Sequence, residues 1–339
     1  MYNNVDMILV TGAAGFIGFH VAKRILESDA DASIIGIDNL NDYYDVNLKH
    51  KRLEILEGFK NFSFKKIDLA DKNAVDELFV QYKPSIIIHL GAQAGVRYSI
   101  ENPQAYLDSN IVGTFNILEG ARQVMPELLV YASSSSVYGN TNQAPFSVED
   151  KTDYPVSFYA ATKKANEVMA YSYAKLYNIT TIGLRFFTVY GPWGRPDMAY
   201  FKFAEKMINN APIELYNSGD MLRDFTYVDD IVDCIVKIIK KKPKFRGGDA
   251  PCKVYNIGNN KPEKLLDFVD TLEALMLEHK LIDKPSNRVL LSMQDGDVMM
   301  THADTAEIEK DFDFKPDTPI KVGLTKFVEW FKQYKYGQK

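Results

Sequence analysis

A glycine-rich turn near the N-terminus constrains the fold of this chain more than any other feature. Residues 7–10 are continuously apolar, which predicts a strand buried on both faces, and Gly12, Gly15 and Gly18 follow directly. Such glycines allow a tight turn, close approach of the backbone to a pyrophosphate, and close packing of a helix on a strand. The expected helix would offer its free N–H groups to phosphate. The spacing is Gly-x-x-Gly-x-x-Gly rather than the usual Gly-x-Gly-x-x-Gly, so a second signal is needed.

An acidic residue at the end of the next predicted strand supplies that signal. Asp38 ends the run 33–37 and lies 20 residues beyond Gly18, where a carboxylate can hydrogen-bond the ribose of a bound dinucleotide. A carboxylate there repels a 2′-phosphate, which favours NAD over NADP. The alternative is that Asp38 is only a turn residue at a strand end.

Predicted strands and helices alternate along the first half of the chain. The strands lie at 62–67, 85–90, 128–132 and 180–186, and the helices at 72–83, 103–123 and 154–177. This alternation predicts an α/β fold with a Rossmann-type doubly wound parallel sheet. In such a sheet ligands bind at the carboxyl ends of the strands. We therefore expect Asp68 and Leu69 at the adenine edge of a dinucleotide, and Arg97 either at the substrate or on the surface.

The pattern changes after residue 186, where a turn-rich binding loop and then shorter elements follow. Asp229 and Asp230 are expected as N-cap and first-turn acid of an apolar helix at 231–239. No repeat or linker marks a separate module. We therefore expect two lobes that are interleaved in sequence. The larger comprises 1–186 with 227–258, and the smaller comprises 187–226 with 259–339.

Composition argues against several kinds of partner and site. The net charge is −5 with both signs scattered, which disfavours nucleic acid and anionic membranes. The longest apolar runs are far shorter than the roughly 20 residues of a membrane span. Cys234 and Cys252 form no Cys-x-x-Cys pair, which suits a reducing cytoplasm. The five histidines show no metal-ligand spacing, so no metal site is expected, and His89 should be packed or flank a cofactor.

A cluster of hydroxyls followed by a tyrosine–lysine pair is the candidate for chemistry. Four serines occupy 133–136, and Tyr159 and Lys163 share one face of a predicted helix. An ammonium beside a phenol would lower the phenol pKa and make the tyrosine a usable general base. Tyr171 and Lys175 have the same spacing. The first pair is preferred because it lies near the helix start, while the second is about 120° further round the helix.

The long helices predicted near 103–123 and 156–177 carry apolar residues on more than one side. Two such helices facing solvent would be a liability. We therefore expect a homodimer in which they form a four-helix bundle across a two-fold axis. The alternative is that the C-terminal part of the same chain covers them.

Several of these features together carry a family resemblance. They are Gly12, Gly15 and Gly18, Asp38, the serines before Val137-Tyr138-Gly139, Tyr159 with Lys163, and the run Arg223-Asp-Phe-Thr-Tyr-Val-Asp-Asp. They resemble the extended short-chain dehydrogenase/reductases over essentially the whole chain. Three longer phrases, at 38–45, 92–99 and 185–198, are similar to those of the UDP-glucuronate 4-epimerase branch of that family.

The resemblance implies a tightly held NAD in the larger lobe and a UDP sugar in the smaller one. The implied NAD contacts are Gly12, Gly15, Phe16, Ile17, Gly18, Asp38, Asn39, Asp68, Leu69, Leu90, Ala92, Gln93, Tyr159, Lys163 and Phe186. Lys163 is also expected to hold the hydroxyls of the nicotinamide ribose.

The implied catalytic set is Ser134, Tyr159 and Lys163, with Ser134 chosen because the family hydroxyl lies three residues before Val137. The implied substrate contacts are Arg97, Ser134, Ser135, Ser136, Tyr159, Thr188, Arg195, Arg223, Arg288 and Asp297. Arg195 could instead be a surface cation of its loop. Gln294 stands where many UDP-hexose epimerases have an arginine, so we expect phosphate binding to rely more on Arg223 and Arg288.

The implied reaction is that of an isomerase, inverting C4 of a UDP-hexuronate, UDP-glucuronate to UDP-galacturonate, through a transient 4-keto intermediate for polysaccharide biosynthesis. That intermediate is a β-keto acid and can lose CO2. Relatives that decarboxylate or dehydrate place acidic residues just before the Val-Tyr-Gly, where this chain has Ser135 and Ser136. We expect these serines, with Thr188 and Arg195, to hold the carboxylate in a plane that disfavours C–C cleavage.

Three other functions are left open. The chain could be a 4-epimerase of neutral UDP-glucose or UDP-N-acetylglucosamine, or a UDP-glucuronate decarboxylase. It could also be a non-catalytic NAD-binding scaffold, because a fold does not fix a function. Such scaffolds tend to lose the tyrosine or the lysine, whereas Tyr159 and Lys163 are both present.

Overall fold

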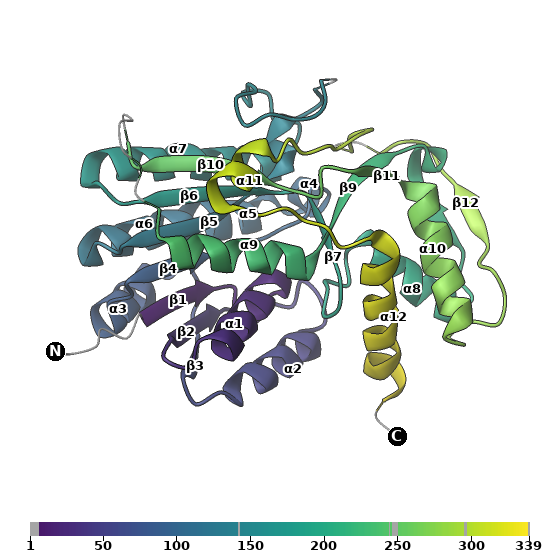
Figure 1. The fold of residues 1–339 in the computed structure, drawn as a ribbon, viewed down its shortest axis with the longest axis horizontal. Helices are drawn as coiled ribbons and strands as arrows, with labels where there is room; N and C mark the ends of the chain where they lie inside the picture. The colour runs from purple at the N-terminus through teal and green to yellow at the C-terminus, as the bar shows by residue number, and fades with distance from the viewer. Residues whose placement is uncertain (1–6, 142, 244, 246–249, 295–296, 338–339) are drawn as a thin grey trace.

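A seven-stranded parallel sheet forms the centre of the computed structural model, which describes residues 7–141, 143–243, 245, 250–294 and 297–337. The strand order is β10-β6-β5-β4-β1-β2-β3 (Figure 1). The strands are β1 (Met7–Thr11), β2 (Ser33–Asp38), β3 (Phe62–Lys66), β4 (Ile86–His89), β5 (Leu128–Ser134), β6 (Thr181–Phe186) and β10 (Cys252–Ile257). The predicted α/β fold with a Rossmann-type parallel sheet is confirmed.

The direction of strand addition reverses at β1, which pairs with β2 on one side and β4 on the other. Such a reversal opens a crevice at the carboxyl ends of the two strands. At those ends, Thr11 Oγ1 and His89 Nδ1 lie 2.8 Å apart, and burial lowers the pKa of His89 to about 3. His89 is therefore a neutral packed residue of the sheet, in keeping with its predicted role.

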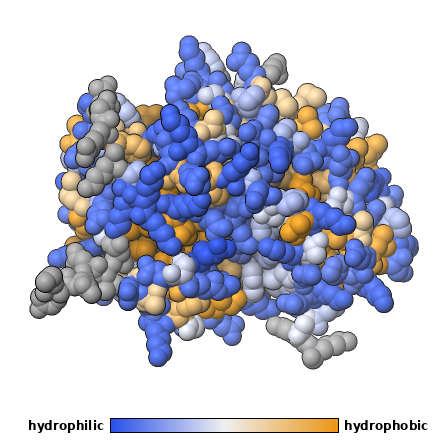
Figure 2. Space-filling model, in the orientation of Figure 1, coloured by the Kyte–Doolittle hydropathy of each residue, from blue (hydrophilic) through white to orange (hydrophobic). Residues whose placement is uncertain are grey.

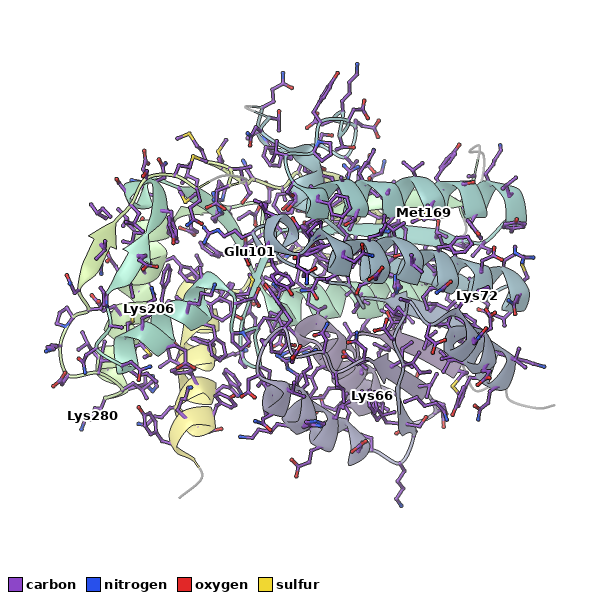
Figure 3. The ribbon with its side chains drawn as sticks, turned by 180° about the vertical axis from the view of Figure 1, so that it is seen from behind. Lys66, Lys72, Glu101, Met169, Lys206 and Lys280 are labelled. Carbon is purple, nitrogen blue, oxygen red and sulfur yellow. The ribbon has the colours of Figure 1, made fainter. Side chains whose placement is uncertain are left out.

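Helices cover both faces of the sheet (Figures 1 and 3). One face carries α1 (Phe16–Ser28), α2 (Val46–Glu57) and α9 (Val228–Lys241), and the other carries α3 (Lys72–Tyr82), α6 (Gly113–Val124) and α7 (Phe158–Tyr177). The helix α1 packs against α2 and α9, while α6 packs between α3 and α7. Each face of the sheet is thus buried, which explains the continuously apolar strands β1 and β4.

The predicted helix at 103–123 is present but is not regular. It consists of α5 (Pro103–Tyr106), a π-helical turn (Leu107–Val112) and α6, and the short α4 (Tyr98–Glu101) precedes it. Single π-helical turns are frequent at functional sites because they re-aim side chains. Here the turn carries Asn110, which is fully buried beside the cavity described below.

A smaller lobe lies beside the carboxyl edge of the main sheet, at the right of Figure 1. It contains the strands β7 (Thr188–Tyr190), β9 (Leu222–Tyr227) and β11 (Pro262–Lys264), the pair β8 (Ile213–Leu215) and β12 (Arg288–Leu290), and the helices α8 (Ala199–Ile208), α10 (Leu265–Glu278) and α12 (Ile320–Tyr336). Aromatic rings fill its core, with Phe225 stacked on Phe268 at 4.0 Å between centroids.

The interleaved two-lobe division stays a prediction, and one segment fits it less well than the rest. The helix α11 (Ala306–Phe312) packs against α9 and β10 rather than within the smaller lobe. A bridge between Phe146 and Ala303 lies just before it. The chain therefore returns to the larger lobe once more than the boundaries 259–339 imply.

Several helix ends differ from the expected ones. The helix α7 begins at Phe158 and not at 154, because Ser157 caps it by accepting a hydrogen bond from the Ala160 N–H at 3.1 Å. The N-cap of α9 is Tyr227, so the prediction that an aspartate caps this helix is wrong. Asp229 and Asp230 both lie in the first turn, where they favour the positive end of the helix dipole.

The helix α2 was not among the expected elements. Its buried face carries Lys49 and Arg52 beside Leu48, Leu53 and Leu56. Because two cations lie within the apolar face, the apolar residues of this helix do not recur at the 3.6-residue spacing by which an amphipathic helix is recognised in a sequence.

The outer face of the π-helical turn, α6 and α7 carries large apolar side chains. Those exposed are Leu107, Val112, Phe115, Val168, Tyr171 and Leu176. Figure 3 shows α6 and α7 side by side on this face, whereas the opposite face, seen in Figure 2, is largely hydrophilic. The alternative that the C-terminal segment covers these helices is wrong for the part of the chain that the structure describes.

Among the described helices, none is long and apolar enough to cross a membrane.

Candidate active site

A cavity of about 500 Å³ opens at the carboxyl ends of the central strands, between the two lobes. Its floor comes from the ends of β1, β2, β4, β5 and β6, and its outer wall comes from β7, β9 and the segment around 297–301. The volume falls in the range typical of small-molecule sites, about 300–1,000 Å³. All fifteen residues predicted to contact NAD line this cavity.

The glycine-rich turn makes one end of the cavity and leaves no room for side chains. Gly12 has φ +69°, and a Cβ there would lie 2.8 Å from the backbone N of Gly91. A Cβ on Gly18 would lie 2.1 Å from the carbonyl oxygen of Gly12. The N-cap of α1 is Gly15, which places no side chain over the first N–H groups of the helix. The turn is thus a cradle of backbone donors, which fits a pyrophosphate.

Asp38 lies at the end of β2, where the adenosine ribose is expected. Its carboxylate accepts a hydrogen bond from the Leu40 N–H at 2.8 Å and keeps oxygen atoms toward the cavity that it lines. Asn39 Nδ2 donates to Asp68 at 3.0 Å, so this residue beside Asp38 contacts one of the two residues predicted at the adenine edge. Lys49 Nζ is 3.8 Å from Asp38, and burial lowers the pKa of this lysine. The carboxylate of Asp38 at this position favours a dinucleotide whose ribose carries no 2′-phosphate.

Ser134, Tyr159 and Lys163 meet on the floor of the cavity. Ser134 ends β5, and Tyr159 and Lys163 lie in the first two turns of α7. Burial raises the pKa of the Tyr159 phenol, while the hydrogen bond with Ser134 and the charge of Arg195 act in the opposite direction. Ser134 therefore stabilises the phenolate, which a general base needs. Tyr171 is exposed on the outside of α7, so the preference for the first pair agrees with the structure.

The expected effect of Lys163 on Tyr159 is not what the structure shows. Lys163 Nζ donates to the carbonyl oxygen of Ala132 at 3.0 Å, and the forces that lower the Tyr159 pKa come from Ser134 and Arg195. Burial lowers the pKa of Lys163 itself to about 8. A direct effect of Lys163 on the phenol therefore stays a prediction, because spacing along a helix does not fix where a long side chain ends.

Arg195 reaches the cavity from the loop after β7. Asp197 binds its Nε and Nη2 atoms at 2.9 and 2.6 Å. A further carboxylate would have to use the Nη1–Nη2 edge of the same guanidinium. Ser135, Ser136 and Thr188 line the same cavity. The structure thus brings together all four residues predicted for a substrate carboxylate.

Arg97, Arg223 and Asp297 gather at the rim of the smaller lobe. Arg97 bonds Asp297 at 2.8 Å, and its guanidinium lies 4.6 Å from the centre of the Tyr216 ring. Arg223 donates to the carbonyl oxygens of Leu222 and Met299 at 3.0 and 3.1 Å, and burial lowers its pKa. Arg223 and Asp297 line the cavity, whereas Arg97 stands just outside it. The rim is a basic patch of the kind that binds a diphosphate.

Arg288 is not part of this rim. It does not line the cavity, and its guanidinium pairs with Asp270 at 2.6 Å and Glu273 at 3.0 Å on α10. The predicted reliance of phosphate binding on Arg288 therefore has no support in the geometry. A search of the described residues finds no group of histidine, cysteine or acidic side chains able to hold a metal ion.

Comparison with known proteins identifies the family. Residues 8–258 match the NAD dependent epimerase/dehydratase family. The chain belongs to this family. A probable UDP-glucuronate 4-epimerase of Rhizobium meliloti is 45% identical over 337 residues, 96% of this chain and 96% of its own length.

Solved structures agree with this assignment. The UDP-glucuronic acid 4-epimerase of Bacillus cereus, in complex with UDP-glucuronic acid and NAD, has a TM-score of 0.87 at 30% identity and covers 97% of this chain and 99% of its own. The UDP-glucose 4-epimerase of Thermotoga maritima, with UDP-glucose, has a TM-score of 0.81 at 26% identity, covering 97% and 99%.

In this member of the epimerase/dehydratase family, a buried ion pair lies beside Ser134 and Lys163, two residues of the candidate catalytic set. Glu167, one turn beyond Lys163 on α7, binds Arg185 of β6 through two hydrogen bonds of 2.8 and 2.9 Å. The same carboxylate accepts from Ser133 at 2.6 Å, next to Ser134. The pair thus ties the helix that carries the tyrosine to the strand end that carries the serines.

The π-helical turn plays a similar role on the other side. Asn110 accepts a hydrogen bond from the Gln93 N–H at 2.8 Å and donates to the Gln93 carbonyl and to Thr162 at 3.0 Å each. A single side chain therefore fixes a predicted NAD contact relative to α7. Sequence reasoning missed Asn110 because nothing in the sequence marks a π-helical turn.

Further cavity residues were also missed. Asn41, Tyr43 and Tyr44 line the cavity and follow Asp38 in a phrase that carried the family resemblance. That phrase was the available signal for them. Lys49 lines the same wall from α2, and no sequence signal pointed to it.

Proposed function

We propose that this protein is a NAD-dependent UDP-glucuronate 4-epimerase, an isomerase that inverts C4 of the uronate to give UDP-galacturonate. The observation that carries the proposal is the placement of Arg195, Ser135, Ser136 and Thr188 around one cavity with Tyr159. A base for the 4-hydroxyl and a binding site for a carboxylate thus share one space. The similarity to the Bacillus cereus enzyme over nearly the whole chain supports the same activity.

NAD fits the larger lobe on structural grounds. The glycine turn is a cradle that any Cβ would fill, and Asp38 presents a carboxylate to the ribose. A bound NAD would supply a reversible hydride acceptor for C4 of the sugar. Lys163, which reaches the cavity from α7, would hold the hydroxyls of the nicotinamide ribose.

Tyr159 serves as the base that takes the proton of the 4-hydroxyl and later gives it back. Ser134 hydrogen-bonds the phenol oxygen and stabilises it as the phenolate. Arg195 contributes a positive charge that acts in the same direction. Because burial opposes ionisation of the phenol, these two partners are needed to make the tyrosine a useful base near neutral pH.

The carboxylate site also bears on the choice between epimerisation and decarboxylation. Ser135 and Ser136 supply hydrogen bonds but no acid or base, and Arg195 offers its Nη1–Nη2 edge to an anion. Held by Arg195, Thr188 and the two serines, the carboxylate would lie in a plane that disfavours loss of CO2. The diphosphate and uridine would lie toward Arg223, Arg97 and Asp297.

The proposal extends to assembly and location. Two copies would associate through the exposed apolar side chains of α6 and α7, such as Phe115, Val168 and Leu176, forming a four-helix bundle. Light scattering of wild type against a Phe115→Glu/Val168→Glu variant tests this, because the variant should be a monomer. We also place the protein in the cytoplasm, where Cys234 and Cys252 stay free thiols.

The decisive experiment incubates the protein with UDP-glucuronate, with and without added NAD, and identifies the sugar by NMR. We expect UDP-galacturonate, and full activity without added NAD would show that the cofactor copurifies. Release of CO2 with a pentose product would indicate a decarboxylase instead. Faster turnover of UDP-glucose than of UDP-glucuronate would favour the epimerase of neutral hexoses, and no turnover of either would leave a scaffold.

A further inference from the structure

Three consecutive backbone carbonyls just before Arg195 are held by two side chains of the larger lobe. His20 Nε2, on α1, lies 2.9 Å from the carbonyl oxygen of Pro192. Arg52 Nη2, on α2, donates to the carbonyl oxygens of Trp193 and Gly194 at 2.5 and 3.1 Å. Residues 192–194, in the loop that leads to Arg195, are thus bound to α1 and α2, which flank the predicted NAD site.

Arg52 is an unusual residue for such a contact. Its side chain is fully buried, and its other hydrogen bonds go to the carbonyl of Ala14 at 2.8 Å and the hydroxyl of Tyr44 at 2.9 Å. The ion pairs found among the described residues do not include it, and its buried Nε has no hydrogen-bond partner there. Burying a guanidinium without a carboxylate is costly. The four hydrogen bonds of this guanidinium go to neutral oxygen atoms, three of them backbone carbonyls.

The segment that Arg52 and His20 hold does not favour its own conformation. Trp193 has φ +57°, which is unfavourable for a residue with a large side chain. At the next position, a Cβ on Gly194 would lie 1.7 Å from the hydroxyl of Tyr200. The Trp193 ring packs against Phe19 and Trp330, at 5.6 and 5.3 Å between centroids. External contacts must therefore hold this backbone, and Arg52 supplies two of them.

The residue that follows is the one proposed to bind the uronate. Arg195 is directed by Asp197, which also accepts a hydrogen bond from Tyr43 at 3.3 Å. Two residues between the end of β2 and the middle of α2 therefore contact this region. Arg52 binds the backbone before Arg195, and Tyr43 binds the Asp197 carboxylate that orients Arg195. Through the Ala14 carbonyl, Arg52 joins this arrangement to the glycine-rich turn as well.

We propose that Arg52, assisted by His20, is a positioning residue for Arg195. By clamping the carbonyls of residues 192–194, it sets the guanidinium of Arg195 for the substrate carboxylate, and it ties that position to the wall of the NAD site. This inference rests on the proposed function, in which Arg195 binds the uronate.

The first test is a double-mutant cycle between Arg52→Lys and Arg195→Ala, with UDP-glucuronate as substrate and NAD in excess. A lysine keeps the charge but cannot bind two carbonyls through one planar fork. We expect Arg52→Lys to raise KM about tenfold in the wild-type background, with a much smaller change in kcat, as for loss of a charged hydrogen bond. In the Arg195→Ala background the same change should have less than about a twofold effect, because the partner it acts through is gone.

A matched control separates this role from simple loss of stability. Leu53→Ala removes a buried side chain of the same helix, next to Arg52, without touching the three carbonyls. It should lower the melting temperature and leave KM within about twofold. Equal effects of Arg52→Lys in both Arg195 backgrounds, or an unchanged KM, would overturn the proposal.

A second readout does not depend on turnover. The chain has two tryptophans, so Trp330→Phe leaves Trp193 as the only reporter of the clamped segment. Adding Arg52→Lys should roughly double the quenching of Trp193 by acrylamide, and adding Leu53→Ala should not. Unchanged quenching would show that Arg52 does not hold the loop. The quenching measurement tests whether Arg52 holds residues 192–194 even if the wild-type protein proves inactive on UDP-glucuronate and the proposed function fails.

Discussion

The floor and the rim of the cavity differ sharply in burial. On the floor, Lys163 is 4% exposed and Ser134 is 7% exposed. Glu167, on the same helix as Lys163, accepts a hydrogen bond from Ser133, the residue before Ser134. On the rim, the Arg97 side chain is 44% exposed and pairs with Asp297 at 2.8 Å. The groups proposed for the chemistry are therefore buried, whereas Arg97, unlike its more buried neighbour Arg223, stands largely in solvent. The two regions should therefore respond differently to substitution.

The largest effect is expected on the floor, from Tyr159→Phe. Removing the hydroxyl deletes the base without changing the packing of the ring, so kcat should fall roughly 10³-fold, within the range for general acid–base catalysis. The melting temperature should change little. Steady-state kinetics and calorimetry would check both, and a variant that kept more than a tenth of the activity would remove Tyr159 from its proposed role.

The second largest effect is expected on the free energy of unfolding, from breaking the buried ion pair between Glu167 and Arg185. Glu167→Met leaves the guanidinium of Arg185 buried without its partner, which costs about 3–5 kcal/mol in free energy of unfolding. Replacing both residues by methionine should restore most of that loss. Urea denaturation of the single and double variants measures this, and a double variant as unstable as the single one would contradict a paired role.

A pH dependence should distinguish the buried lysine of the floor from the exposed cations of the rim. Burial lowers the pKa of Lys163 from its usual 10.5 to about 8. Between these values the unfolded chain holds a proton that the folded chain has lost, so this group makes stability rise with pH. The destabilisation is full below pH 8 and disappears by about pH 10.5.

The measurement compares wild type with Lys163→Met by denaturation at pH 7.5 and pH 10, after bound nucleotide has been stripped. Wild type should gain up to about 3 kcal/mol relative to the variant. A difference between the two proteins that stays constant with pH would mean that Lys163 is not desolvated in the folded state.

The smallest effect is expected on the rim. Arg97→Gln removes an exposed ion pair, which is worth about 1 kcal/mol or less, so KM for the UDP sugar should rise about threefold with kcat unchanged. Arg288→Gln is the matched control, because this arginine pairs with α10 outside the cavity. A larger loss from the control than from Arg97→Gln would invert the comparison between the two sites.

Much of the fold and of the NAD site could be predicted because those features are local. The apolar run of β1, the glycine positions and Asp38 stand in one continuous βαβ unit, and steric limits on a Cβ decide the glycines directly. The NAD contacts that the family resemblance implied all line the cavity, including those outside this unit, such as Tyr159, Lys163 and Phe186. The helix α2 escaped prediction because its buried face includes Lys49 and Arg52, whose burial depends on partners far away in the sequence.

The charged residues show the limit of sequence reasoning. The family resemblance implied both Arg97 and Arg288 as substrate contacts, with Arg97 left open as a surface cation; Arg97 bonds Asp297 at the rim, while Arg288 bonds Asp270 and Glu273 away from it. Spacing along the chain cannot separate them, because a long side chain ends wherever a carboxylate from another element meets it. The direction of Lys163 toward Ala132 has the same origin.

The sequence by itself determined the parallel α/β fold and the dinucleotide turn, since each follows from the period of a helix or strand and from the size of a side chain, while the pairing of Tyr159 with Ser134 came from the family resemblance. Only the tertiary structure decided which cations reach the cavity, which helix faces stay exposed, and how Arg52 fastens the loop before Arg195. Those outcomes depend on desolvation and on the partners that distant segments bring together. Neither of these is written in local spacing.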